Sequence, residues 1–123
     1  MPTQNQHVTQ AIHNHTFWTS FDTNSTAFLD WVVTGMFYEG VHWAEAVLSA
    51  YGEHPTNHKQ RFAAMNRHQA EMGPIIMDLE TLKTESENAR YMCYKHTPGD
   101  LSNDLTPLIV GIRTYTQSKF GIY

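Results

Sequence analysis

The chain has 123 residues and a formal net charge of −4 at pH 7, which fits one domain spanning 1–123 with enough length to bury a core. The negative charge excludes a general electrostatic attraction to DNA or to an anionic membrane, so neither is an expected partner. Acidic residues interrupt the most apolar stretch at Asp30, Glu39 and Glu45, which excludes a membrane span there. The single cysteine, Cys93, cannot form an internal disulfide, and the N-terminus lacks a signal-peptide pattern, so we expect a cytoplasmic protein.

Apolar residues recur at helical spacing along most of the chain, and no segment requires a strand. This periodicity predicts an all-α fold, a compact bundle of four to five helices. The predicted helices are 5–20, 28–50, 57–72, a fourth from residue 74 to before residue 97, and a last one from residue 101 onward.

Capping and breaking residues mark the expected boundaries of these helices. Asn24 or Ser25 is expected to cap the central helix 28–50. Gly73 and Pro74 are expected to separate the third helix from the fourth, with Pro74 at its first position. Thr106 is expected to cap the regular part of the last helix, because Pro107 suits the first helical position.

The central helix 28–50 is apolar on two faces, which predicts that the other helices pack around it. Glu39 and His42 lie within its more apolar face, where burial without partners would be costly. A Glu-x-x-His pair is half of the pattern of di-metal carboxylate bundles, but no second copy exists. A metal site at Glu39 and His42 is therefore a weak alternative to a buried pair that also binds a neighbouring helix. We expect no metal and no other cofactor.

The third predicted helix carries the most suggestive pair of polar residues, Arg61 and His68. They are seven positions apart, with six residues between them, so a continuous helix would place both on one flank, beside the buried stripe that contains Phe62 and Met65. An arginine can hold a phosphate by paired hydrogen bonds, and a histidine can move a proton at neutral pH. The alternative is a solvated helix edge on which Arg61 pairs with a nearby acid. His58 is expected to be a hydrogen-bonded core histidine rather than a metal ligand.

Structural rather than catalytic or metal-binding roles are expected for the other polar and aromatic candidates. His7, His13 and His15 lie on different sides of the first helix and do not converge on a metal. Cys93 lies on the apolar stripe of the fourth helix and is expected to be a small buried hydrophobe. Core or dimer-interface positions, rather than a base-stacking platform, are expected for Trp18, Trp31, Trp43, Tyr38 and Tyr91.

Several short motifs occur in a recognisable order along 7–94. The central stretch contains Asp30-Trp31, Phe37-Tyr38 and His42, and then His58 three residues before Arg61. Flanking these are His13-Asn14 in the first helix and Ala89-Arg90-Tyr91 after Leu82 and Ser86. With these motifs the chain resembles the small prokaryotic HEPN-type helical domains, which the last helix matches only in kind.

The resemblance implies a helical bundle that forms a homodimer and acts on RNA. In active members, an arginine, four to six residues and a histidine form a metal-independent endoribonuclease site across the dimer, where the RNA 2′-hydroxyl attacks the adjacent phosphate. Arg61 and His68 match that spacing, which implies phosphate binding by Arg61 and general acid or base catalysis by His68. The neighbouring His58, Lys59 and Arg67 are then expected to contact the substrate.

The alternative function is a non-catalytic interaction module that binds a protein partner, of the toxin–antitoxin or phage-defence type. Phe62 favours it, because active members usually carry a polar residue directly after the arginine. In this hypothesis Arg61 and His68 make only structural salt bridges or bind an anion. A metal-binding helical bundle is the third hypothesis.

Overall fold

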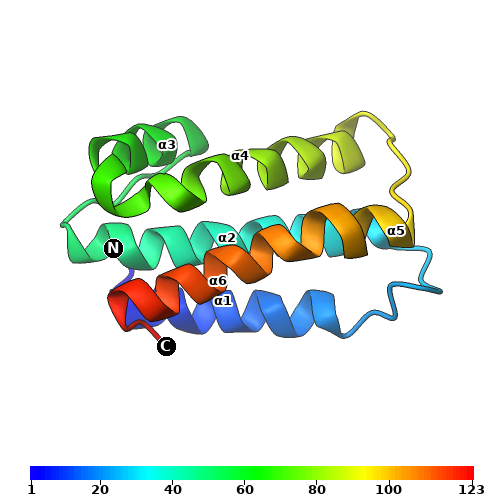
Figure 1. Ribbon diagram of the computed structural model, residues 1–123, viewed down its shortest axis with the longest axis horizontal. Coiled ribbons are helices and arrows are strands. Elements are labelled where there is room, and N and C mark those ends of the chain that lie inside the picture. Colours follow the sequence, from blue (N-terminus) through cyan, green and yellow to red (C-terminus); the bar gives the residue numbers. More distant parts are fainter.

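The computed structural model describes residues 1–123 and confirms the all-α bundle (Figure 1). No strand is present, and no helix is both long enough and apolar enough to cross a membrane. The elements are α1 (Gln4–Thr19), α2 (Leu29–Ala50), α3 (His58–Arg67), α4 (Gln69–Tyr91), the short α5 (Pro98–Asp100), a π-helical turn η1 (Leu101–Leu105) and α6 (Thr106–Phe120).

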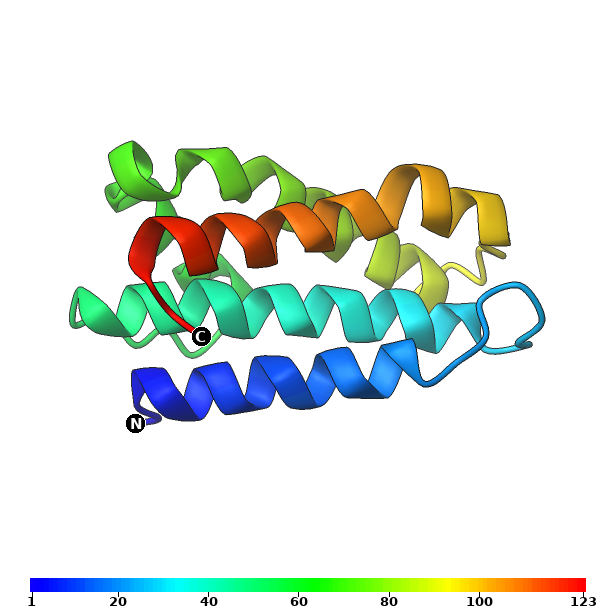
Figure 2. The ribbon, with the colours of Figure 1, turned by 60° about the horizontal axis from the view of Figure 1, so that its bottom comes forward.

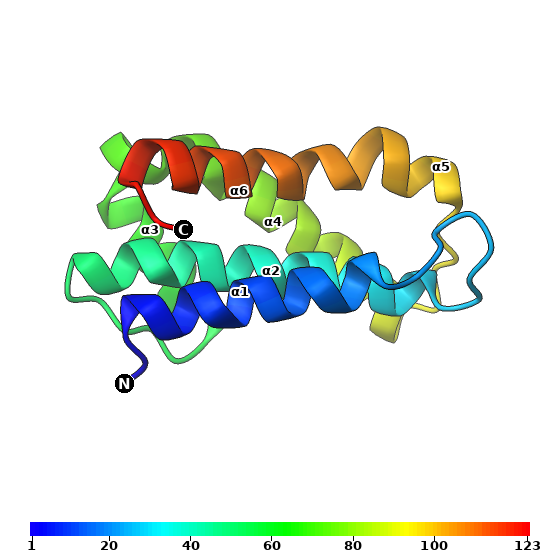
Figure 3. The same ribbon diagram turned by 90° about the horizontal axis from the view of Figure 1, so that it is seen from below.

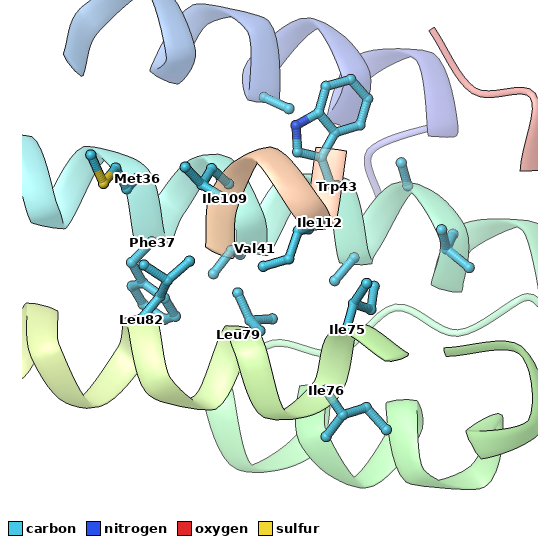
Figure 4. Close-up of a cluster of buried hydrophobic side chains, with 14 of the residues drawn as sticks. Met36, Phe37, Val41, Trp43, Ile75, Ile76, Leu79, Leu82, Ile109 and Ile112 are labelled. Atoms are coloured by element: carbon cyan, nitrogen blue, oxygen red, sulfur yellow. The ribbon is translucent and has the colours of Figure 1, made fainter. Parts of the chain in front are cut away.

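Helix α2 is the centre of the bundle, as its two apolar faces predict. It contacts α1, α3, α4 and α6, with α1 on one side and α4 and α6 on the other (Figures 2 and 3). Phe37 and Val41 point toward α4, whereas Trp43 points toward α1 (Figure 4). Facing α2 in the same core are Leu79 and Leu82 of α4 and Ile109 and Ile112 of α6, all fully buried.

Two glycines of α2 allow neighbouring helices to approach closely. A Cβ atom at Gly35 would lie 2.9 Å from Trp18 Cβ, and one at Gly40 would lie 2.8 Å from Leu79 Cδ1. Trp18 Cβ is fixed to the α1 backbone, so α1 can pack at this depth only against glycine, whereas the Leu79 methyl group near Gly40 can move aside.

The first turn of α2 differs from the prediction. Helix α2 begins at Leu29 with Phe28 at the N-cap position, and no side chain caps it, so the expected cap at Asn24 or Ser25 is wrong. These residues form a separate turn, in which the Asp22 side chain accepts a 3.0 Å hydrogen bond from the Asn24 N–H. An aspartate side chain commonly accepts a hydrogen bond from the backbone N–H two residues ahead. Here that bond stabilises a local turn at Asp22 in place of a helix N-cap at Asn24 or Ser25.

The break between the third and fourth helices lies at His68 and not at Gly73-Pro74. His68 has non-helical torsions (φ −112°, ψ 36°), and its carbonyl accepts hydrogen bonds from the first turn of α4. Pro74 lies inside α4, near its N-terminus. The predicted continuous helix 57–72 is therefore wrong, and with it the geometric reason for placing Arg61 and His68 on one flank.

The C-terminal helix begins earlier than expected. Thr97 forms a capping box with Asp100, and Pro98 occupies the first turn. The chain then stays helical through η1, where the Thr106 N–H bonds the Leu101 carbonyl, so the expected cap at Thr106 is wrong. A π-helical turn widens the backbone by one residue, and Pro107, which has no N–H, follows directly.

Cys93 is exposed, contrary to the prediction of a buried position. Helix α4 ends at Tyr91, and Cys93 has a positive φ of 55° in the following segment. The helical stripe therefore stops before it reaches Cys93.

Candidate functional site

Two polar clusters lie along α2, and each is built around a glutamate. The first, the Glu39 centre, comprises Glu39 with His15 and Trp18 of α1, Trp43 of α2 and Arg113 of α6. The second, the Glu45 cluster, comprises Glu45 with His7 of α1, His42 of α2 and His58 and Arg61 of α3. Each brings together residues from at least three helices.

The Glu39 carboxylate is completely buried and fully hydrogen-bonded. Its Oε1 accepts from Trp18 Nε1 at 2.8 Å, and its Oε2 accepts from Trp43 Nε1 at 2.8 Å. The Arg113 guanidinium donates to Oε2 at 2.8 Å and to Oε1 at 3.2 Å, and His15 Nδ1 lies 3.1 Å from Oε1. A buried carboxylate needs such partners to offset its lost hydration. This centre ties α1 and α6 to α2.

The Glu45 cluster contains Arg61, which is 7 % exposed. Its Nε and Nη2 donate to Glu45 Oε1 at 2.9 and 2.6 Å, and its Nη1 lies 2.6 Å from His58 Nδ1. Burial, followed by the positive charge of Arg61, lowers the pKa of His58 below its usual value of 6.5. The neutral His58 ring can therefore accept a hydrogen bond from Arg61, which matches the expected hydrogen-bonded histidine.

Two histidines complete the Glu45 cluster. His7 Nδ1 lies 3.1 Å from His42 Nδ1, and His7 Nε2 lies 3.4 Å from Glu45 Oε2. Burial is the largest cause lowering the pKa of His7 and of His42, and Arg61 lowers both further. Both rings are consequently neutral near pH 7, with one ring nitrogen donating to the other.

This histidine pair borders an open hollow of about 700 Å³. Besides His7 and His42, its lining residues are Met1, Pro2, Asn5, Gln6, Thr9 and Gln10. His54, in the loop after α2, is close enough for a positive charge on it to lower the pKa of His7. The Glu45 cluster therefore combines buried charge with access to solvent, a combination typical of functional sites.

His68 has a different environment from Arg61. Its Nε2 lies 2.5 Å from Glu53 Oε2, and its ring stacks on Tyr51 with the centroids 4.2 Å apart. Glu53 also accepts hydrogen bonds from Arg67, and these lower the pKa of Glu53. His68 and Arg61 share no bonding partner within the chain, because α3 ends between them.

The other residues expected at the site are distributed as follows. Lys59 is exposed on α3, and Arg67 is exposed and paired with Glu53. Glu39 and His42 share no partner: Glu39 belongs to its own centre, and His42 faces His7. Glu39 does bind neighbouring helices, but not as a pair with His42.

Sequence reasoning missed His7 and Glu45 as site residues. His7, His13 and His15 do not converge with one another, as predicted, but His7 meets His42 across the α1–α2 contact. The available signal was the i, i+3 spacing of His42 and Glu45, which places both on one helical face.

The chain matches no protein-family model, no curated protein and no solved structure.

Proposed function

We propose that this protein is a non-catalytic helical interaction module whose first partner is a second copy of the same chain. The observation that carries the proposal is an exposed aromatic face at the end of the bundle where α2 begins and α4 ends. Its members are Phe28, Trp31, Tyr38, Tyr91 and Tyr94, with Arg90 beside Tyr38 and Tyr91, and all five aromatic residues are at least 36 % exposed.

Contacts between its members support treating the aromatic face as one surface. The Arg90 guanidinium lies 5.7 Å from the Tyr38 ring centroid and 5.1 Å from that of Tyr91. Trp31 and Tyr94 line the same hollow of about 330 Å³, together with Phe28. The loops before α2 and after α4 lie at the same end of the molecule (Figure 1). Tryptophan, tyrosine and arginine are the residues most enriched at energetically important interface positions.

The charges on this surface favour a second copy as the occupant. Asp30, Arg90 and Lys95 make no salt bridge within the chain. A two-fold contact places each patch against its own copy, so an unpaired acid can meet an unpaired base twice. A patch that carries both signs is suited to such pairing.

The environment of Arg61 and His68 supports the non-catalytic part of the proposal. Arg61 is bound to Glu45 by two hydrogen bonds and is almost inaccessible to solvent. To hold a phosphate it would have to leave a buried carboxylate without its partner, which is costly. We therefore assign Arg61 to a structural ion pair with Glu45 and His68 to a hydrogen bond with Glu53 in the monomer.

The oligomeric state tests the proposed interaction. Sedimentation velocity should give twice the chain mass of 14.1 kDa, and Trp31→Ser should shift the protein toward the monomer. Ile12→Ser is the matched control, because Ile12 and Trp31 are both 49 % exposed and Ile12 lies on α1, outside the aromatic face. A monomeric wild type at all concentrations, or equal dissociation by both variants, contradicts the proposal.

An RNA assay separates this function from the ribonuclease that the resemblance implies. We expect no cleavage of a mixed-sequence single-stranded RNA in EDTA by folded wild-type protein. Cleavage that leaves 2′,3′-cyclic phosphate ends and is lost in His68→Ala would instead establish the metal-independent endoribonuclease. Quenching of tryptophan fluorescence by RNA without cleavage, and its loss in Trp31→Ser, would identify the aromatic face as a nucleic-acid surface.

A further inference from the structure

We propose that His7, His42 and Glu45 form a binding site for one divalent transition-metal ion, Zn²⁺ by the chemistry of the ligands. One ring nitrogen of each histidine and one carboxylate oxygen of Glu45 all lie within 4.8 Å of one another. Imidazole nitrogen and carboxylate oxygen are both common zinc ligands. None of the three ligands belongs to the aromatic face, so this inference is independent of the interaction function.

The spacing of the two imidazoles matches shared coordination. His7 Nδ1 and His42 Nδ1 are 3.1 Å apart. Two imidazoles on a tetrahedral zinc ion, with bonds of about 2.0 to 2.1 Å, hold their nitrogens about 3.3 Å apart. The nitrogens therefore need to separate by only a few tenths of an ångström, while the rings turn so that both nitrogens point at an ion beside the line that joins them and the proton between them is released.

Glu45 offers one oxygen to the ion while Arg61 holds the other. Both guanidinium hydrogen bonds go to Oε1, at 2.9 and 2.6 Å. Oε2 is the oxygen that Arg61 leaves free, and it lies 3.4 Å from Nε2, the ring nitrogen of His7 that does not contact His42, so the carboxylate or the His7 ring turns when both bind one ion. Hydrogen bonds to a ligating carboxylate fix its orientation at metal sites. Arg61 thus acts as a positioning residue for Glu45.

The start of α1 is fixed in a way that places His7 against α2. Thr3 and Gln6 form a capping box, with the Thr3 N–H donating to Gln6 Oε1 at 2.8 Å. The Gln4 side chain donates to the Ala46 carbonyl of α2 at 3.1 Å. His7 itself is only 5 % exposed. Because the ligands are held before an ion arrives, less ordering is required on binding.

Three protein ligands leave a fourth position open on the side of the hollow. His7 and His42 line this hollow, where the neutral polar residues Asn5, Gln6 and Gln10 also lie. Two histidines, one glutamate and a water molecule form a set that zinc uses in catalytic sites, whereas structural zinc is usually enclosed by four protein ligands. The hollow gives both the ion and a small ligand a path to the site.

Metal titration of the untagged, EDTA-treated protein, freed of chelator, tests this inference. Calorimetry with Zn²⁺ should give one ion per chain, and Co²⁺ should give the visible absorption bands of a four-coordinate ion. His42→Gln should weaken binding by more than about tenfold. His13→Gln is the control, because it removes an exposed histidine from the same helix α1 without touching the cluster.

Equal weakening by His13→Gln and His42→Gln would indicate adventitious surface binding and would overturn the proposal. Wild-type protein that takes up neither ion would overturn it without any variant. If His42→Gln does not fold, X-ray absorption of the zinc-loaded wild type decides, because the proposal requires two imidazoles on the ion. Dimerisation through the aromatic face is measured separately, so the failure of either proposal leaves the other standing.

Discussion

Glu39 and Glu45 lie on the same helix, but their carboxylates have opposite environments. Glu39 is enclosed by two tryptophan N–H groups and a guanidinium, and both of its oxygens have donors. Glu45 has one oxygen held by Arg61, while the other faces a histidine pair beside an open hollow. A carboxylate whose oxygens are all bonded to protein donors has no capacity left for a ligand. Glu39 is therefore suited to a structural role, and only Glu45 has an oxygen left for the proposed metal ion.

The largest expected effect is from Glu39→Leu. It leaves the buried indole N–H groups of Trp18 and Trp43 without an acceptor and the Arg113 guanidinium without its carboxylate, so the free energy of unfolding should fall by about 3 to 5 kcal/mol. Urea denaturation followed by circular dichroism measures this. The double variant with Arg113→Leu should recover part of the loss, because it also removes the unpaired charge. A single variant as stable as the wild type would contradict the structural role of Glu39.

The next effect is from Arg61→Leu, which leaves Glu45 without its cation. The Glu45 side chain is 12 % exposed, so water compensates only partly, and we expect a loss of about 2 to 3 kcal/mol in unfolding free energy. Arg67→Leu is the matched control, because Arg67 lies on the same helix and pairs with Glu53 at the exposed surface. Its effect should fall within the error of the same urea titration. Equal losses would contradict the distinction between the two pairs.

Gly35→Ala tests how closely α1 must approach for Trp18 to reach Glu39. The new Cβ would lie 2.9 Å from Trp18 Cβ, an atom fixed to the α1 backbone, so α1 must shift. Overpacking costs about 1 to 3 kcal/mol, against a gain in helix propensity of about 1 kcal/mol. We therefore expect a small net loss of stability in thermal unfolding, together with changed Trp18 fluorescence.

Gly40→Ala serves as its control. The conflicting atom there is the terminal Cδ1 of Leu79, which can move by rotation of the side chain. Gly40→Ala should therefore lower the stability less than Gly35→Ala does. A larger loss for Gly40→Ala would contradict the requirement for glycine where α1 packs on α2.

The smallest expected effect is the pH dependence that His58 contributes. Its pKa in the folded chain is lowered from 6.5 by burial, and Arg61, Lys83 and Arg90 lower it further against the opposing charge of Glu87. As the pH falls below about 6.5, the unfolded chain binds the proton first, so stability declines until the folded-state pKa is passed. His58→Gln should flatten this decline in urea titrations made in EDTA between pH 7 and pH 5. An unchanged slope would contradict the lowered pKa.

Much of the fold follows from local pattern. The apolar spacing of the segments identified every long helix, and the two-sided apolarity of 28–50 identified α2 as the centre. These features are predictable because burial of a helical face depends on residues three and four apart in the same segment.

The helix boundaries were less predictable, because competing local bonds decide them. The break at His68 is stabilised by stacking on Tyr51 and by the bond to Glu53, both from the segment after α2. The sequences of α3 and α4 therefore do not predict a break at His68. Gly73-Pro74 is a strong local helix-breaking signal, yet both residues lie inside α4. The separation of Arg61 from His68 follows from this break.

The sequence alone determined that this protein is a helical bundle around 28–50, that Glu39 requires buried partners, and that Arg61 is paired with an acid or exposed to a ligand. Tertiary structure decided which partners surround Glu39 and that Arg61 is paired with an acid. The register between α1 and α2 brings His7 to His42 and Trp18 to Glu39, and α6 supplies Arg113 from the far end of the chain. Helical periodicity gives the direction of a side chain on its own helix, but the partner it meets depends on the depth and offset at which two helices pack.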